Sequence, residues 1–224
     1  MSYARCHQPS LYGTEVLPKS VGVENRPNPR NAPTILNAAL QLAAHWYGDR
    51  ISVEAKIKAL PSYKGMFAKA FPGEKDPVTQ QNCGKATGAY ERTLVTASPF
   101  DSYLKGDIAA LSAATKAGLT EFLAAGYASR HDGVGVGGRT FKKFGIIADY
   151  WAATGGREVG KGRYNVTNDK ADIYVFKVPV LCNVPMAAPY FHAGSVATLS
   201  QAIRVMADLQ MGRKLNDQQV EPMV

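Results

Sequence analysis

Two histidines each close a five-residue segment with the spacing of a C-x-x-C-H motif. The first segment is Tyr3-Ala4-Arg5-Cys6-His7, and the second is Tyr127-Ala128-Ser129-Arg130-His131. An intact motif of this kind attaches haem through two thioether bonds, and its histidine is an axial ligand of the iron. The first segment keeps one cysteine and the histidine, whereas the second keeps the histidine alone. The spacing predicts one haem held by a single thioether bond and, at the second segment, a haem held at most without covalent attachment.

The composition is that of a folded protein with a basic surface. The 224 residues are 46% apolar, the net charge is +8 and the pI is about 9.4. This length suits one large domain or two small ones. The positive charge is dispersed and no stripe of Lys and Arg alternates with aromatic residues, which favours an acidic protein partner over nucleic acid. No run of about 18 apolar residues is present, so no membrane span is expected.

The three cysteines provide no second metal motif. Cys6, Cys83 and Cys182 form no C-x-x-C pair, and their number gives neither a disulfide framework nor a zinc site. We expect Cys83 and Cys182 to be buried apolar residues. No signal peptide precedes the first motif, although covalent haem attachment takes place outside the cytoplasm. The chain is therefore expected to be a fragment, or else not to be matured in that way.

Helix signals dominate the chain between irregular segments. The first 30 residues contain four prolines and are expected to form loops. The fold class is predicted as mostly α with long loops, and each half repeats the order of motif, loop and helix, with a boundary near residues 106–112. One short extended segment is expected over residues 173–180. Helices are predicted from Thr34 to before Gly48, over 52–60 and 62–71, from a Thr79 cap to about Thr96, from a Ser112 cap to Gly126, from a Thr198 cap to about Met211, and from Asn216 onward.

Seven short strings, spread through nearly the whole chain, carry a resemblance to a known family. They are Arg30-Asn31-Ala32-Pro33-Thr34, Leu36-Asn37-Ala38-Ala39, His45-Trp46-Tyr47-Gly48-Asp49-Arg50, Ala89-Tyr90-Glu91-Arg92-Thr93-Leu94, Phe141-Lys142-Lys143-Phe144-Gly145, Ala188-Pro189-Tyr190-Phe191-His192 and Val205-Met206-Ala207-Asp208-Leu209-Gln210. In this order they resemble the bacterial dihaem cytochrome c peroxidases. The resemblance implies two cytochrome c-like haem domains, a peroxidatic one over residues 1–108 and an electron-transfer one over residues 109–224. Both ends look truncated beside that family.

The family resemblance implies an activity and a setting. The reaction would reduce hydrogen peroxide to water with electrons from a small redox donor, either a cytochrome c or a copper protein. The protein would work in the periplasm, and such proteins are often homodimers.

The resemblance also implies which residues hold the two haems. Cys6 would be the remaining attachment cysteine of the peroxidatic haem, and His7 its proximal iron ligand. His131 and Met206 would be the two axial ligands of the electron-transfer haem. A thioether ligand raises the potential of its iron, as an electron-entry site requires.

The catalytic and calcium residues follow from the same resemblance. Glu91 matches the distal acid/base, which moves a proton between the two peroxide oxygens. Gln81, ten residues earlier on the same predicted helix, matches the distal amide, and Trp46 matches an electron relay between the haems. An interdomain calcium takes hard oxygen ligands. Its implied ligands are the Asn37 side chain and the backbone carbonyls near Val178 and Val180.

The sequence departs from this pattern at the attachment cysteines. Tyr3 replaces one of them, and Tyr127 and Arg130 replace both in the second motif. Arg130 would place a charge beside an apolar macrocycle, which is costly unless the charge is paired. We therefore expect weak or absent haem at the second site.

Several alternatives remain open at this point. The chain could be a haem-poor or single-haem homologue that acts as a non-catalytic binding or electron-carrier protein, in which case the histidines are ordinary loop residues and Met206 is a core residue. A related branch oxidises protein side chains, but it uses a tyrosine in place of Met206. The glycine-rich segments 133–138 and 155–162 lack the context of nucleotide-binding loops.

Overall fold

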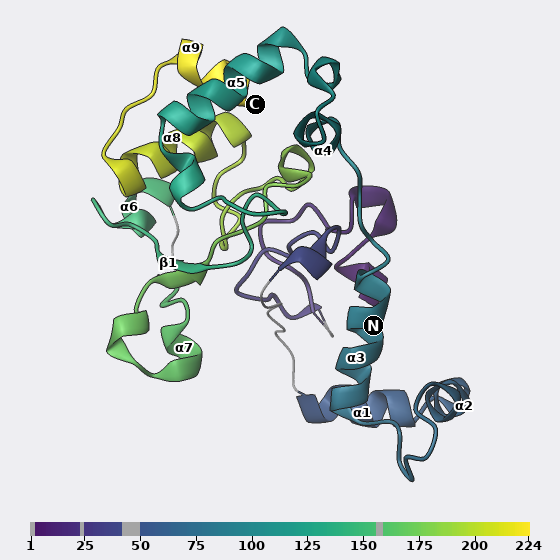
Figure 1. The fold of residues 1–224 in the computed structure, drawn as a ribbon. Helices are drawn as coiled ribbons and strands as arrows, with labels where there is room; N and C mark the ends of the chain where they lie inside the picture. Colours follow the sequence, from purple (N-terminus) through teal and green to yellow (C-terminus); the bar gives the residue numbers. More distant parts are fainter. Residues whose placement is uncertain (1–2, 23–24, 42–49, 156–158) are drawn as a thin grey trace.

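The computed structural model describes residues 3–22, 25–41, 50–155 and 159–224, with the backbone alone described for residues 50–53. Figure 1 shows two groups of elements, one from each half of the chain. In the N-terminal half, α3 ends beside the first motif, and α1 and α2 lie at the other end of α3. The C-terminal half gathers α5, α8 and α9. A mostly α fold is therefore confirmed, with one small sheet among the described residues.

The N-terminal half combines short helices with long loops. Its helices are α1 (Arg50–Lys58), α2 (Pro61–Ala70), α3 (Gln80–Glu91) and α4 (Pro99–Leu104), and its 3₁₀ turns include Tyr3–Arg5, Pro9–Leu11 and Ala38–Leu40. Thr79 caps α3 as expected, because its side chain accepts the Asn82 N–H. The helix expected from Thr34 is wrong over residues 34–41, since Asn37 adopts a left-handed conformation with φ 58° and only one 3₁₀ turn follows. α3 also ends at Glu91, five residues before the expected end.

The C-terminal half is built around α5 and α8. Its elements are α5 (Ala113–Ala124), β1 (Phe141–Lys143), α6 (Tyr150–Thr154), α7 (Tyr164–Thr167), β2 (Val175–Lys177), α8 (Leu199–Met211) and α9 (Asp217–Val220). β1 and β2 are antiparallel, with Phe141 opposite Lys177. Ser112 and Thr198 cap α5 and α8 as expected, by accepting backbone N–H groups of the first turn.

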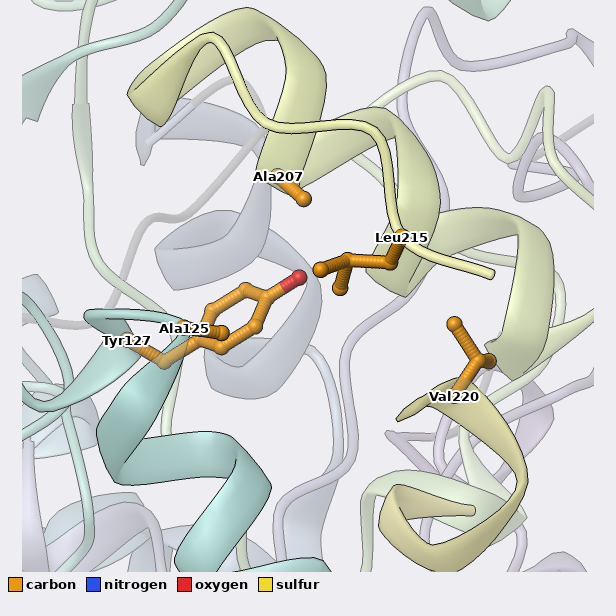
Figure 2. Packing of buried hydrophobic residues seen from close by; sticks show 5 residues of the cluster. All are labelled: Ala125, Tyr127, Ala207, Leu215 and Val220. Atoms are coloured by element: carbon orange, nitrogen blue, oxygen red, sulfur yellow. The ribbon is translucent and has the colours of Figure 1, made fainter. Parts of the chain in front are cut away.

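Two apolar clusters share α8. The first contains Ala125, Tyr127, Ala207, Leu215 and Val220 (Figure 2), and the second contains Phe144, Tyr150 and Leu209. Met206 packs against both clusters from the same helix. α8 therefore forms the centre of the C-terminal half.

The end of the chain closes the first cluster. A Cβ atom on Gly118 of α5 would overlap the Pro222 carbonyl, so only glycine lets the C-terminal turn approach α5 this closely. Arg204 of α8 donates to the Leu215 carbonyl and pairs with Asp217, and Arg213 donates to the Ala124 carbonyl. These bonds hold the last residues against α5 and α8.

Two further expectations concern the cysteines and the membrane. Cys83 and Cys182 are partly exposed instead of fully buried, although burial still raises the pKa of both thiols. None of the helices in the described ranges has the length and apolar character needed to cross a membrane.

Candidate functional site

The first motif fixes the orientation of His7. It begins with the 3₁₀ turn Tyr3–Arg5, and the His7 N–H donates to the Tyr3 carbonyl at 3.2 Å. The His7 Nδ1 atom lies 3.0 Å from the Gly13 carbonyl oxygen. Because a carbonyl can only accept, Nδ1 must carry the proton, and Nε2 remains for a metal. A histidine ligand is usually oriented by this kind of bond.

Gly13 makes this orientation possible. Its φ is +74°, and a Cβ there would lie 2.7 Å from the Ile35 Cγ1 atom. Its carbonyl also accepts the Ile35 N–H at 3.3 Å. Only glycine satisfies both the backbone conformation and the close approach. The residues at the first site therefore fit an iron ligand at His7.

Cys6 lies half-buried beside a carboxylate. Burial raises the pKa of its thiol, Glu15 adds to the rise, and Arg5 opposes it. Glu15 is 7% exposed, and its Oε1 atom has no hydrogen-bond partner among the described residues. Cys6 is thus a neutral thiol at neutral pH, available for one thioether bond.

Tyr3 joins the first motif to α3. Its hydroxyl donates to the Glu91 Oε1 atom at 2.5 Å, and its ring centroid lies 4.8 Å from that of His7, tilted by 34°. Burial raises the pKa of Tyr3, and the hydrogen bond and charge of Glu91 raise it further. The phenol therefore stays protonated and is the donor in this pair. The sequence identified Tyr3 only as a lost cysteine.

A cation from the C-terminal half lies near Glu91. Lys177 of β2 is partly buried and donates to the Gln41 Oε1 atom. Burial lowers the pKa of Lys177, and the charge of Glu91 acts in the opposite direction. Glu91 thus lies where the two halves of the chain meet.

The described residues do not place the other two catalytic candidates, Gln81 and Trp46, next to Glu91. Gln81 is exposed in the first turn of α3, and ten residues of helix separate it from Glu91 by about 15 Å along the axis. The neighbouring Asn82 is buried instead, and its Nδ2 atom donates to Glu74 at 2.7 Å and to the Pro77 carbonyl at 3.0 Å. Trp46, the expected electron relay, lies outside the described residues.

The second motif uses its tyrosine as a core residue. Tyr127 is 6% exposed, and its ring stacks on that of Phe122 with centroids 5.3 Å apart. Its hydroxyl donates to the Ile203 carbonyl of α8 at 2.6 Å. Burial raises the pKa of Tyr127 to about 12. Figure 2 shows the ring directed toward Ala207 and Leu215.

His131 differs from His7 in its burial and in the hydrogen bonding of its ring. It is 7% exposed, and its Nδ1 atom makes no hydrogen bond within the described part of the chain. The buried Nε atom of Arg130 is also without a partner among those residues. Burial lowers the pKa of His131, while the backbone groups of Val136 and Pro179 act in the opposite direction.

The second segment offers no residue for covalent attachment of a haem. Met206 is one residue before the buried Ala207, and the Tyr127 ring packs against that part of α8. Tyr127 and Met206 thus pack in the same apolar cluster. Neither Tyr127 nor Arg130 can form a thioether bond.

The proposed calcium residues provide neutral oxygens. The Asn37 Oδ1 atom accepts the Thr96 N–H at 3.0 Å, and the Val178 carbonyl accepts the Gly138 N–H at 2.9 Å. Each oxygen keeps one lone pair, which fits the donor chemistry of calcium. Val178 and Val180 are both buried. In the described ranges, no group of three or more His, Cys, Asp or Glu residues is placed to hold a metal ion.

Comparisons with known proteins agree on one family. The family model described as di-haem cytochrome c peroxidase matches residues 1–60 and 48–109. The cytochrome c551 peroxidase of Pseudomonas aeruginosa is 37% identical over all of this chain and 71% of its own length. The protein of the same name from Nitrosomonas europaea is 34% identical over 98% of this chain and 70% of its own length.

A solved structure shows the same architecture. It is described as a MauG-like protein associated with microbial copper homeostasis. It matches with a TM-score of 0.72 and 26% identity, over 91% of this chain and 69% of its own. The arrangement of elements described above is therefore that of a known structure.

Proposed function

The chain belongs to the di-haem cytochrome c peroxidase family, and from this premise we propose that it is an oxidoreductase that reduces hydrogen peroxide to water with electrons from a small redox protein. The observation that supports this most is the orientation of His7. Its Nδ1 proton is held by the Gly13 carbonyl, so its Nε2 atom is the one left to bind iron. Cys6, the adjacent residue, would supply the single thioether bond.

The proposed division of labour follows the two halves. Residues 1–108 form the peroxidatic cytochrome c-like domain, and residues 109–224 correspond to the electron-transfer domain. Bound haem supplies a redox-active iron that takes up electrons and passes them to peroxide. Calcium between Asn37 and the Val178–Val180 backbone would connect the two domains.

Glu91 is the proposed acid/base. It accepts the proton from one peroxide oxygen and returns it to the oxygen that leaves as water. It lies on α3 within hydrogen-bond distance of Tyr3, which itself contacts His7. The positively charged surface suits an acidic donor protein, and we place the protein in the periplasm, where such donors and c-type haem occur.

Substitution of Glu91 tests this proposal. With haem-loaded chain, Glu91→Gln should lower peroxide-dependent oxidation of a reduced cytochrome c by about 10²–10⁴-fold, because the proton is no longer transferred. The haem content should stay the same. Glu121→Gln on α5, far from the first motif, is the matched control. Full activity of Glu91→Gln would contradict the proposal.

A second candidate is a single-haem electron carrier or binding protein without catalysis. It is favoured by Tyr127 and Arg130 at the second site, which leave the first site without an internal electron donor. A haem-loaded chain that cycles between oxidation states but does not consume peroxide would support this alternative.

A further inference from the structure

The hydroxyl of Tyr3 donates to a carboxylate, which distinguishes it from three other tyrosines of the chain. It lies 2.5 Å from the Glu91 Oε1 atom, 88 positions away in the sequence. The hydroxyls of Tyr127, Tyr150 and Tyr190 instead donate to backbone carbonyls. A carbonyl accepts a hydrogen bond but does not keep the proton, whereas a carboxylate can keep it. Tyr3 therefore has a proton acceptor in direct contact.

This proton acceptor matters for the removal of an electron from the ring. A phenol that has lost an electron is a very strong acid, so oxidation is favourable only if the proton leaves as well. A tyrosine in water is usually oxidised after it has become a phenolate, which is rare well below about pH 10. Burial raises the pKa of Tyr3 and Glu91 raises it further, so this route is closed at neutral pH. The Glu91 carboxylate provides the other route, in which the proton and the electron leave together.

We propose that Tyr3 is a redox-active tyrosine, which is oxidised to a neutral tyrosyl radical while its hydroxyl proton passes to Glu91. In this step the Tyr3 O–H bond breaks, an O–H bond forms on the Glu91 carboxylate, and one electron leaves for the oxidant. The oxidant is a high-potential one-electron acceptor, a class that includes a haem iron oxidised by peroxide. The return of one electron and of the proton on Glu91 restores the phenol.

The contact between Tyr3 and His7 suits an electron relay. The two ring centroids lie 4.8 Å apart with a tilt of 34°, so the phenol ring contacts the candidate iron ligand directly. Reduction of one peroxide molecule takes two electrons, and the second segment has no cysteine to attach a second haem. Tyr3 would supply one of the two electrons, and the external redox protein would return it. This role rests on the proposed function, whereas the oxidation of Tyr3 itself needs only the contact with Glu91.

Three further titratable groups face this pair. They are His7, which lies against the Tyr3 ring, the exposed Tyr90, and Lys177 of β2, whose charge interacts with that of Glu91. Between about pH 7.5 and 9, an ordinary histidine and an ordinary tyrosine are both neutral. Burial lowers the pKa of Lys177, so a Lys177→Gln variant, which carries no charge at any pH, separates its titration from that of the pair.

Freeze-quench electron paramagnetic resonance of the full-length haem-free chain tests the proposal. The probe is excess hexachloroiridate(IV), a soluble one-electron oxidant. The unchanged chain should form a tyrosyl radical at a rate that is the same from about pH 7.5 to 9, because Glu91 takes the proton throughout this range. Tyr3→Phe should lower the rate at the lower pH by about 10²-fold, which is the smaller contribution expected of a positioned base. Tyr12→Phe, at an exposed tyrosine near the first motif, is the control and should react like the unchanged chain.

The second variant, Glu91→Gln, keeps the Tyr3 ring and a hydrogen-bond acceptor but cannot keep a proton. Its rate should fall to that of Tyr3→Phe and then rise about tenfold per pH unit, as the phenolate fraction does. Lys177→Gln should keep the rate independent of pH, and a slope in this variant would mean that Lys177 takes the proton instead of Glu91. Equal rates in Tyr3→Phe and the unchanged chain, or a rate independent of pH in Glu91→Gln, would overturn the proposal.

Two outcomes separate this inference from the proposed function. If the haem-loaded chain reduces peroxide but Tyr3→Phe forms the radical as fast as the unchanged chain, the redox role of Tyr3 is overturned and the peroxidase assignment stands. If Tyr3 forms the radical as expected but the haem-loaded chain does not reduce peroxide, Tyr3 is redox-active and the peroxidase assignment fails.

Discussion

The two motif segments place a tyrosine where the first attachment cysteine would stand, yet the tyrosines behave differently. Tyr3 is partly exposed, and its hydroxyl bonds the Glu91 side chain. Tyr127 is buried, and its hydroxyl bonds the backbone of α8. A bond between two side chains can break without disturbing a core, whereas a buried ring cannot leave without opening one. A tyrosine in place of the first cysteine is therefore a partly exposed side chain that can move at the first segment, and a fixed part of the core at the second.

The histidines extend this contrast. The Gly13 carbonyl accepts the His7 Nδ1 proton and so fixes the ring for a metal. At the second site, a Cβ on Gly137 would overlap the Pro179 carbonyl, and Gly137 has a φ of +123°. The glycine lets the two backbones approach, but the His131 Nδ1 atom still makes no hydrogen bond within the described chain. The backbone groups of Val136 and Pro179 nevertheless act on the His131 ring, so the two segments differ in the hydrogen bond made by Nδ1 and not in the presence of backbone groups beside the ring.

The largest expected effect concerns haem. His7→Ala should remove haem binding and peroxide turnover completely, because it removes the proposed iron ligand. His131→Ala should leave the haem-to-protein ratio near one per chain, because the second segment has no cysteine to attach a haem. The pyridine haemochrome spectrum of the loaded variants measures this. If the unchanged chain bound two haems and His131→Ala lost one of them, the second segment would be a haem site like the first, and the prediction would be wrong.

The next effect concerns stability. Tyr127→Ala should lower the free energy of unfolding by about 3–5 kcal/mol, since it removes a buried aromatic ring and leaves a cavity beside α8. Tyr3→Ala should cost about 1 kcal/mol, because its ring is partly exposed and it loses mainly one hydrogen bond. Urea unfolding of the haem-free chain measures both. Equal losses of unfolding free energy in the two variants would contradict the assignment of Tyr127 to the core and of Tyr3 to a partly exposed position.

The sequence predicted the elements whose signals are local. The hydroxyls of Thr79, Ser112 and Thr198 each accept a hydrogen bond from the backbone N–H three residues later. Such a helix cap depends only on neighbouring residues, so the sequence alone can predict it. The helix from Thr34 failed because the side chain of Asn37 bonds Thr96, 59 positions away, and holds a left-handed turn. Propensity carries no information about such a partner.

For the candidate site, the sequence likewise identified single residues but not the contacts between distant ones. The motif spacing identified His7 and His131 as candidates, and the resemblance identified Glu91. Neither could show that Tyr3 bonds Glu91, because that contact depends on how α3 packs against the first motif. The burial of Tyr127 was equally hidden, since tyrosine is intermediate between the residue types found mostly in cores and those found mostly on surfaces.

A further effect, smaller than the loss expected for Tyr127→Ala, is a difference in alkaline stability. Burial raises the pKa of Tyr127 from its ordinary value of 10 to about 12, so the folded state binds this proton more tightly than the unfolded state. Its contribution is fully present below pH 10 and is lost as the pH rises through 12. The free energy of unfolding of the unchanged chain should therefore fall by about 2 kcal/mol more than that of Tyr127→Phe between pH 10 and 12. Parallel urea unfolding curves across this range would measure it, and identical pH profiles for the two proteins would show that Tyr127 titrates as an exposed residue and is not part of the core.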